Sequence, residues 1–289
     1  MKRTTAPFPL EGAEARGSKP ACAGLDGPRK GGLSRPRGLQ GTPADRQSRL
    51  RDVRSTLSRC CTCALATCSI AAAAADLTSP IGAGPTPAAP WRVRGLPQQG
   101  PTPTRFEVAV DPDGTRALRI EADRAYGTLV HPLPGARAGT LAWRWRVDRP
   151  VAGADLQRKS GDDAALKVCA LFDMPLARVP FVERQLLRLA SARVDEALPT
   201  ATLCYVWEPT LPANTLLHNA YTHRVRFITA RHAVGAWSSE QHDLARDFRR
   251  AFGDESDDVP PLTALLIGAD TDNTGGHSLA WLDGLRLLP

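Results

Sequence analysis

The stretch GADTDNTGGHSLAWLDGLRL, residues 268–287, decides the fold that we predict for this chain. It places an acidic, glycine-bearing turn between two apolar runs, Leu262–Ile267 and Leu279–Leu287. Asp, Asn and Gly favour tight turns because they bond the nearby backbone or adopt left-handed conformations. The pattern therefore predicts a strand, a tight polar loop and a closing strand.

Short runs with β character also precede this stretch. The clearest, LAWRWRV at residues 141–147, alternates apolar side chains with arginines, so one face should be buried and the other wet. Further strands are expected at Phe106–Val110, Ala117–Ala122, Gly127–Leu133, Ala164–Phe172, Thr202–Trp207, Arg224–Ala230, Leu262–Ala269 and Ser278–Leu287. Helical insertions are expected at Pro180–Ala197 and His242–Phe252. The set predicts a mainly β fold, an antiparallel two-layer β-sandwich of the jelly-roll type.

Composition divides the chain near Asp76. Residues 1–75 hold 13 lysines and arginines against 5 acids, whereas the whole chain holds 37 against 30, so residues 76–289 hold 24 against 25. The basic character therefore belongs to the leader, and the body has no positive surplus that would neutralise phosphates. This argues against a nucleic-acid partner. We expect a Pro/Gly/Ala linker at 76–103 and the sandwich domain at 104–289.

The leader has two parts. Residues 1–52 are rich in Gly, Pro, Arg and Ser and show no apolar period, which predicts disorder. The segment 53–75 begins with Arg54 and Arg59, continues with an uncharged, mostly apolar stretch and ends in a run of alanines before Asp76. This order is typical of an export signal, although an Ala-rich internal helix or linker is the alternative.

We therefore predict that translation begins near Val53 and that the mature chain, starting near Asp76, is periplasmic or secreted. A lipoprotein anchored through Cys68 is less favoured, because Thr67 is bulkier than the residue that usually precedes such a cysteine. The signal-like segment is too short and too weakly apolar for a transmembrane span.

Several motifs lie along the body: Trp143–Val147, Lys159–Asp163, Cys204–Trp207, Trp237 followed by Asp243–Phe252, and Asp270–Thr274. Together they resemble a bacterial family of exported proteins known as domain of unknown function 3047. Their order and spacing also match, over roughly residues 91–289. The resemblance implies a β-sandwich similar to carbohydrate-binding modules, and it brings no catalytic residues.

The closing turn is the candidate metal site, with calcium as the ion. Its candidate ligands are Asp270, Asp272, Asn273 and Thr274. Oxygen ligands at alternate positions before a glycine match the first half of an EF-hand loop, but Trp281 stands where that loop needs a glutamate. An EF-hand is excluded, whereas a calcium site in a sandwich loop is not. The alternative is that these side chains only cap the turn.

A second acidic turn, Asp162-Asp163, leads into another apolar run and would supply further ligands. We take these two acids, with Trp207 and Trp237 as stacking rings, as candidate residues for a ligand such as a glycan. Asp162 or Asp163, paired with Asp270 or Asp272 or with Glu208, would also suit a glycoside-hydrolase-like enzyme, which needs two carboxyl groups. A structural or envelope-interaction protein is the third hypothesis. The separation of the acids distinguishes an ion site from a hydrolytic pair.

Cys169 and Cys204 lie in the middle of two predicted strands. In an oxidising compartment they would pair if those strands are neighbours, and otherwise they would be buried free thiols.

Overall fold

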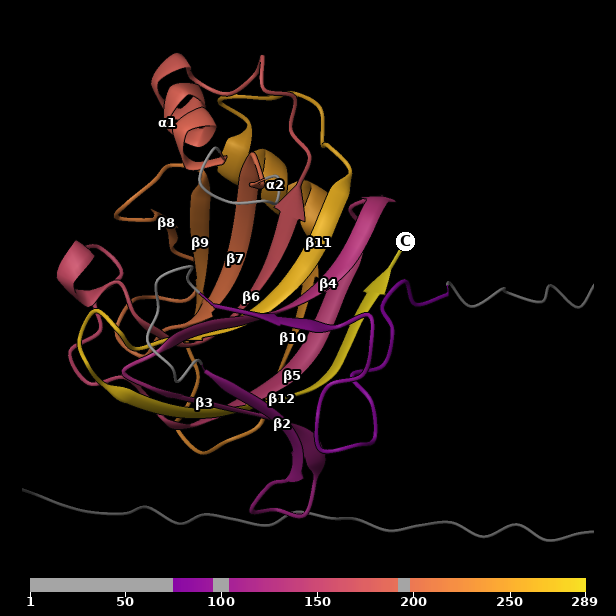
Figure 1. The fold of residues 1–289 in the computed structure, drawn as a ribbon, viewed down its shortest axis with the longest axis vertical. Coiled ribbons are helices and arrows are strands. Elements are labelled where there is room, and N and C mark those ends of the chain that lie inside the picture. The colour runs from indigo at the N-terminus through magenta and orange to yellow at the C-terminus, as the bar shows by residue number, and fades with distance from the viewer. Residues whose placement is uncertain (1–74, 96–103, 192–197) are drawn as a thin grey trace, which may run out of the picture. The chain divides into compact units, whose positions relative to one another are not determined.

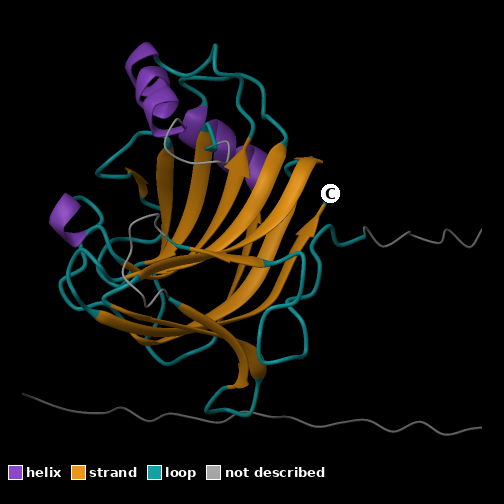
Figure 2. Cartoon of the chain, viewed as in Figure 1, coloured by secondary structure: helices purple, strands orange, loops and turns teal. Residues whose placement is uncertain are grey.

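The computed structural model describes residues 75–95, 104–191 and 198–289. The predicted leader, apart from Ala75, and the end of the first predicted helix lie outside these ranges. Figures 1 and 2 show two β-sheets packed face to face, with the helices at their margins. This confirms the predicted mainly β sandwich. Among the described residues, no helix has the length and apolar character needed to cross a membrane.

The elements follow one another along the chain as a series of strands interrupted by three short helices. They are β1 (Arg92–Arg94), β2 (Arg105–Val110), β3 (Arg116–Asp123), β4 (Tyr126–Ala136), β5 (Thr140–Arg149), η1 (Lys159–Gly161), β6 (Ala164–Phe172), α1 (Phe181–Ser191), β7 (Ala201–Trp207), β8 (Leu216–His218), β9 (Val225–Ala230), β10 (Ser238–Asp243), α2 (Leu244–Phe252), β11 (Leu262–Asp270) and β12 (His277–Leu288).

One sheet has seven strands in the order β1-β4-β11-β6-β7-β9-β8, and the other has five in the order β10-β5-β12-β3-β2. All neighbours are antiparallel except the parallel pair of β7 and β9. The closing turn joins β11 in the first sheet to β12 in the second. The loops before β4 and β6 also cross between the sheets at this end, so they meet the closing turn.

The core lies between the two sheets and follows the predicted period. Leu141, Trp143, Trp145 and Val147 are all buried. On the opposite face of β5 Arg144 is exposed as predicted, but Arg146 is buried because its guanidinium is paired with the acids of the neighbouring turn and strand. Removing a large apolar side chain from water is worth about 1.5–3 kcal/mol, so this one strand contributes substantially to the free energy of unfolding.

The two predicted helices differ from the observed ones in detail. The second does not begin at His242, because β10 pairs with β5 through Asp243, whose side chain then caps α2 by accepting the N–H of Arg246. In α1 the apolar residues Val182, Leu186 and Leu189 are exposed. The short strands β1 and β8 were not predicted.

Much of the predicted linker packs against the sandwich. Asp76 accepts the backbone N–H of Leu287, and β1 pairs with β4. Trp91 is buried and donates its indole N–H to the carbonyl of Ser79. A tryptophan among prolines is the sequence signal for such an anchor.

Cys169 and Cys204 form a disulfide. They stand directly opposite each other in the register of β6 and β7. The pairing resolves the alternatives that the sequence left open.

Candidate functional site

The acidic residues of the two predicted turns meet where the closing turn crosses between the sheets. The carboxylate of Asp163 accepts the backbone N–H of Asn273 at 3.1 Å and that of Thr274 at 2.8 Å. It also accepts the side-chain donors of both residues. Asp163 therefore caps the closing turn from a distant part of the sequence. The predicted alternative, in which the turn acids cap their own turn, does not describe Asp270.

Asp270 is the last residue of β11, opposite Tyr126 of β4 and Ala164 of β6. Its carboxylate oxygen Oδ2 lies 3.3 Å from the Lys167 Nζ, whereas its Oδ1 is buried without a hydrogen-bond partner. Carboxylate oxygens of Asp163, Asp270 and Asp272 lie within 4.8 Å of one another. An unpartnered buried acceptor beside two further carboxylates is an arrangement that a cation would stabilise.

Charge at this end is unbalanced. Burial raises the pKa of Asp270 to about 8. The charge of Lys167 opposes this rise, whereas a hydrogen bond that protonated Asp270 makes with Asp272, and the charges of Asp272 and Asp163, add to it. Burial also raises the pKa of Asp162, whose Oδ2 accepts the side-chain N–H of Asn219 at 2.5 Å. The negative charge of these carboxylates, when all are ionised, therefore exceeds the positive charge of the Lys167 ammonium group.

Lys167 lies along the outer side of β11. Gly268 stands opposite it in the register, and a Cβ there would come within 3.1 Å of the lysine side chain. The ammonium group also lies 5.2 Å from the ring centroid of Tyr126. Burial opposes its charge, yet the carboxylate of Asp270 holds the pKa of Lys167 above its ordinary value. Lys167 is therefore a fixed cation beside the site.

Tyr221 adds an exposed ring to the acidic end. Its side chain is 56% exposed, and its hydroxyl lies 2.9 Å from the side-chain oxygen of Asn273 and 3.0 Å from the carbonyl of Lys159. The Lys159 Nζ lies 5.3 Å from its ring centroid. Contacts from two separate segments, the closing turn and η1, position this ring.

The donor set suits a hard cation such as calcium, which takes six to eight oxygen ligands from carboxylates, carbonyls and water. Asp270 and Asp272 supply carboxylate oxygens, and Asp163 would share one that already caps the turn. The carboxylate oxygens of three acids lie within 4.8 Å of one another, which is close enough for one ion to contact all three. An inverting hydrolytic pair, which needs carboxyl groups about 6.5–9.5 Å apart, does not fit this separation.

The other predicted site residues lie elsewhere. Trp207 is buried in the core between the sheets. Trp237 donates its indole N–H to Asp111 at 2.6 Å, and the guanidinium of Arg144 lies over its ring. Glu208 accepts backbone N–H groups from the turn that follows it. The structure therefore brings the acids together but does not bring either tryptophan to them.

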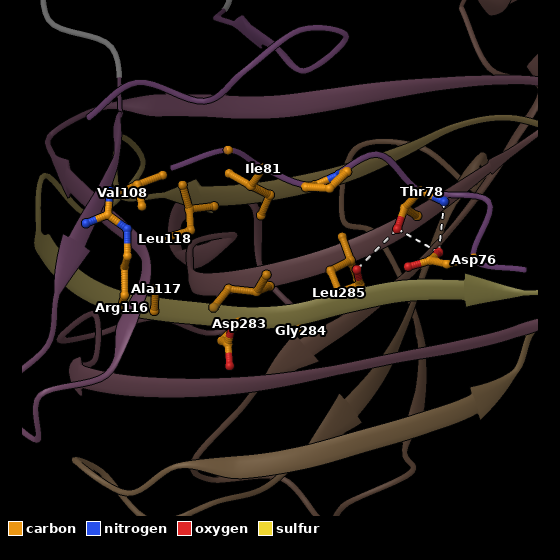
Figure 3. Close-up of a pocket in the computed structure, with 13 residues that line it drawn as sticks. Asp76, Thr78, Ile81, Val108, Arg116, Ala117, Leu118, Asp283, Gly284 and Leu285 are labelled. Atoms are coloured by element: carbon orange, nitrogen blue, oxygen red, sulfur yellow. Dashed lines mark hydrogen bonds between the residues drawn. The ribbon is translucent and has the colours of Figure 1, made fainter. Parts of the chain in front are cut away.

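A cavity of about 360 Å³ lies away from the acidic end, under residues 76–82 (Figure 3). Its apolar lining includes Ile81, Leu118 and Leu285. The carboxylate of Asp76 at its edge is already occupied by Thr78 and by the backbone of β12. The cavity therefore has a largely apolar lining, and the carboxylate at its edge is already hydrogen-bonded within the protein.

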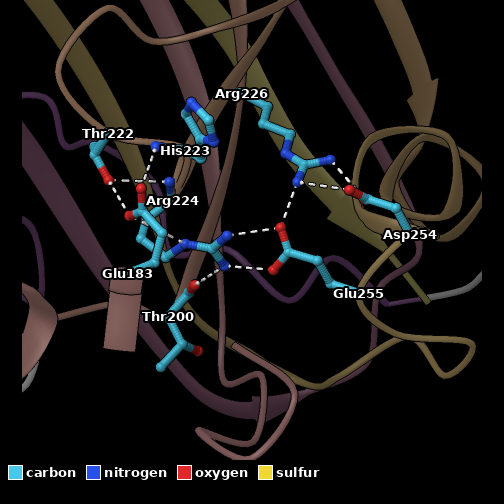
Figure 4. Close-up of polar contacts among 8 residues, drawn as sticks. All are labelled: Glu183, Thr200, Thr222, His223, Arg224, Arg226, Asp254 and Glu255. Carbon is cyan, nitrogen blue, oxygen red and sulfur yellow. Dashed lines mark hydrogen bonds and ion pairs between the residues drawn. The ribbon is translucent and has the colours of Figure 1, made fainter. Parts of the chain in front are cut away.

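A second charged cluster, the arginine network, lies at the start of β9 on its inner side, where the guanidinium of Arg226 lies over the ring of Phe252 (Figure 4). Arg224 binds Glu255 through two hydrogen bonds of 2.6 Å, and it lies 3.6 Å from Glu183 of α1. Arg226 binds Asp254 at 2.9 Å and also contacts Glu255. Two guanidinium groups therefore hold three carboxylates, which ties α1 to the segment after α2.

Three contributors to the acidic end were not identified from the sequence: Lys167, Asn219 and Tyr221. Lys167 has a recognisable signal, because a single lysine inside the apolar run ALKVCALF needs a buried partner. Asn219 and Tyr221 belong to the loop between β8 and β9 and give no such signal, because β8 itself was not predicted.

Comparison with known proteins gives one family. A family model described as "Protein of unknown function (DUF3047)" matches residues 89–286. No curated protein matches the chain.

Three solved structures share parts of the fold. The carbohydrate-binding module TmCBM61, solved with β-1,4-galactotriose, has 9% identity and a TM-score of 0.30 over 69% of this chain and 88% of its own. A family 12 xyloglucanase from Bacillus licheniformis has 6% identity and a TM-score of 0.33, covering 69% and 99%. The K3 adhesin domain of Lys-gingipain from Porphyromonas gingivalis has 13% identity and a TM-score of 0.28, covering 70% and 93%. These likenesses carry no argument about ligand or activity here.

Proposed function

We propose that this chain, which belongs to the DUF3047 family, is an exported binding module that holds a calcium ion and a glycan at its acidic end. The observation that carries the proposal is the buried, unpartnered Oδ1 of Asp270 beside the carboxylates of Asp163 and Asp272. A divalent cation would satisfy that oxygen and offset the surplus negative charge.

The glycan part of the proposal depends on Tyr221 and not on the tryptophans considered from the sequence. Its exposed ring would stack against the apolar face of a sugar, as aromatic side chains do in binding sites that combine an apolar surface with polar groups. Asp272, an exposed residue of the adjoining turn, offers carboxylate oxygens as acceptors for hydroxyl groups. A bound calcium ion would coordinate hydroxyls in the same way that it coordinates water.

Export is supported by two independent features. The order of charged, apolar and small residues in segment 53–75 is that of a signal peptide. The disulfide between Cys169 and Cys204 is of the kind that persists in oxidising compartments. N-terminal sequencing of the exported protein should begin at or near Asp76, and a cytoplasmic chain that retains Met1 would contradict this part.

An array of immobilised polysaccharides, probed with the purified protein in excess calcium and in chelator, tests the function. We expect binding that needs calcium, at least a tenfold loss in Tyr221→Ala, and no loss in the matched control Tyr126→Phe, whose ring remains beside Lys167. Calcium binding is measured separately by titration calorimetry. If the protein binds calcium but no glycan, the glycan part of the proposal is wrong and the ion site stands. If it binds neither calcium nor a glycan, the whole proposal is overturned.

A further inference from the structure

Helix α1 carries an apolar stripe that faces solvent. Val182, Leu186 and Leu189 share one face, because residues four and three apart lie one above another on a helix. The exposed fractions along the stripe and just before it are 68% for Val182, 52% for Leu186, 62% for Leu189, 66% for Phe181 and 45% for Leu176. Single exposed apolar residues are ordinary, but five together mark an interaction surface.

The stripe is held outward by contacts on the other side of the helix. Leu187 packs against the core between the sheets. Glu183 accepts the hydroxyl of Thr222 at 3.0 Å and the backbone N–H of His223 at 3.4 Å, as Figure 4 shows. The arginine network therefore fixes the orientation in which α1 shows its apolar side chains to solvent.

The charges around the stripe are positive. Residues 173–191 contain three arginines and two acids, the exposed Asp173 and Glu183, whose carboxylate is engaged as described. Arg178 and Arg188 are exposed, and the guanidinium of Arg184 lies 5.7 Å from the ring centroid of Phe181. A partner that complements this surface is apolar and negatively charged, which is the chemistry of an anionic lipid interface.

The stripe and the acidic end are separated by the full length of β6. That strand starts immediately after Asp163 and ends at Phe172, before the segment that leads into α1 (Figure 1). At about 3.3 Å per residue its 9 residues span about 30 Å. A protein held at α1 would therefore present the acidic end away from the surface that holds it.

We propose that α1 is a membrane-docking helix: its stripe of Val182, Leu186 and Leu189, with Phe181 beside it, enters the interface of a bilayer that contains anionic phospholipid, and Arg178 and Arg188 lie beside the headgroups. The helix lies on the bilayer, because its 11 residues are too few to span a core that needs about 20. This surface is independent of the calcium site.

Flotation with lipid vesicles tests the proposal, and chelator throughout separates it from the calcium site. The probes are vesicles of phosphatidylglycerol with phosphatidylethanolamine and vesicles of phosphatidylcholine alone. We expect the full chain to float with the first and not with the second, and binding to weaken as salt is raised. The double variant Val182→Ser/Leu186→Ser should bind at least tenfold less, and Arg188→Glu should also reduce binding. The matched control Val234→Ser, a similarly exposed valine outside α1, should bind as wild type.

Both variants change exposed side chains, so their circular dichroism and melting should match the wild type. Wild-type protein that stays in the soluble fraction with both kinds of vesicle would overturn the proposal. Equal binding by the double variant would also overturn it. A wild-type dimer in solution that Val182→Ser/Leu186→Ser converts to a monomer would assign the stripe to a second copy of the chain and would overturn docking to lipid.

Discussion

The acidic end and the arginine network are both built around three carboxylates, but they differ in the cations supplied to them. Glu183, Asp254 and Glu255 are held by two arginines. At the acidic end the carboxylates of Asp163, Asp270 and Asp272 lie close together, and Lys167 is paired with Asp270. The atoms left without hydrogen bonds are donors in the first cluster, the Nε atoms of Arg224 and Arg226, and an acceptor in the second.

This difference separates a structural cluster from a binding site. In the arginine network each carboxylate has a charged partner within the fold, and the network serves to hold α1 and the segment after α2. At the acidic end the fold leaves a buried carboxylate oxygen free and raises the pKa of its owner, Asp270. A cation from solution would complete the second cluster but has no acceptor to satisfy in the first.

The largest effect is expected from breaking the arginine network. Arg224→Met leaves Glu255 and Glu183 without this buried partner, which should lower the free energy of unfolding by about 3–5 kcal/mol. The measurement is urea denaturation, in excess calcium and in chelator. The loss should be the same in both, and a recovery in calcium would contradict the view that this cluster is closed to ions.

Lys167→Met is the matched change at the acidic end. Removing the resident cation should lower the free energy of unfolding by about 2 kcal/mol in chelator, less than a fully broken pair because Asp270 then takes up a proton more readily. Excess calcium should restore part of this loss by binding the carboxylates that the lysine has left. The same denaturation experiment measures it, and an identical loss in calcium and chelator would contradict a cation site.

The pH dependence of calcium affinity sharpens the contrast further. Because the pKa of Asp270 is raised from 3.8 to about 8, an ion that binds below pH 8 displaces a proton. Affinity measured by calorimetry should rise by about tenfold per pH unit up to about pH 8 and then level off, which corresponds to about 1.4 kcal/mol per unit. Without calcium, in chelator, the stability of the fold should change with pH in the opposite direction. The raised pKa means that this carboxyl stabilises the fold at low pH and loses that contribution as pH rises toward 8.

A third cluster, around His242, has its charges paired within the fold. Changing it should alter the free energy of unfolding least. His242 lies 2.8 Å from Glu240 and 3.4 Å from Asp247, while Tyr205 donates its hydroxyl to Asp247 at 2.9 Å. Burial opposes the charge on each group, but these contacts raise the pKa of His242 and lower the pKa values of Glu240 and Asp247. Aromatic rings of Trp143 and Tyr205 stack on the imidazole.

The histidine contributes stability below its unfolded pKa of 6.5 and loses it as pH rises through the higher folded value. The carboxylates contribute above their unfolded values of 4.5 and 3.8 and lose this as pH falls. The contribution is therefore greatest between about pH 4.5 and 6.5. His242→Gln should cost about 1 kcal/mol in that window and less at pH 9, measured by melting across pH. A loss independent of pH would mean that only packing is affected.

The sequence predicts features that depend on neighbouring residues and does not predict contacts between residues far apart in the chain. Alternation along Leu141–Val147 depends on neighbours in sequence and on burial, so it predicts a sandwich strand correctly. The capping of Asn273 and Thr274 by Asp163 joins residues 110 and 111 positions apart, and no local pattern contains these contacts. The exposed side of α1 is a similar case, because an amphipathic pattern gives a helix two faces but does not say which one meets the protein.

The tryptophans show the same limit. The sequence proposes Trp207 and Trp237 as stacking rings of one ligand site, yet they lie in the core and beside Asp111, respectively. Their places are set by β7 and by the turn between β2 and β3, which belong to different sheets. The ring that does lie at the acidic end, Tyr221, is brought there by Asn273 and Lys159.

The most direct test of the calcium site is the melting temperature in excess calcium and in chelator, for wild type, Asp270→Asn, Asp272→Asn and the exposed control Asp257→Asn. At a calcium concentration of 100 times the dissociation constant, binding adds about 2.7 kcal/mol. For a domain of this size that is a rise of about 5–10 °C. We predict this rise for wild type and Asp257→Asn, and its loss in Asp270→Asn and in the more exposed Asp272→Asn. A wild-type curve that is identical in calcium and in chelator would contradict the account.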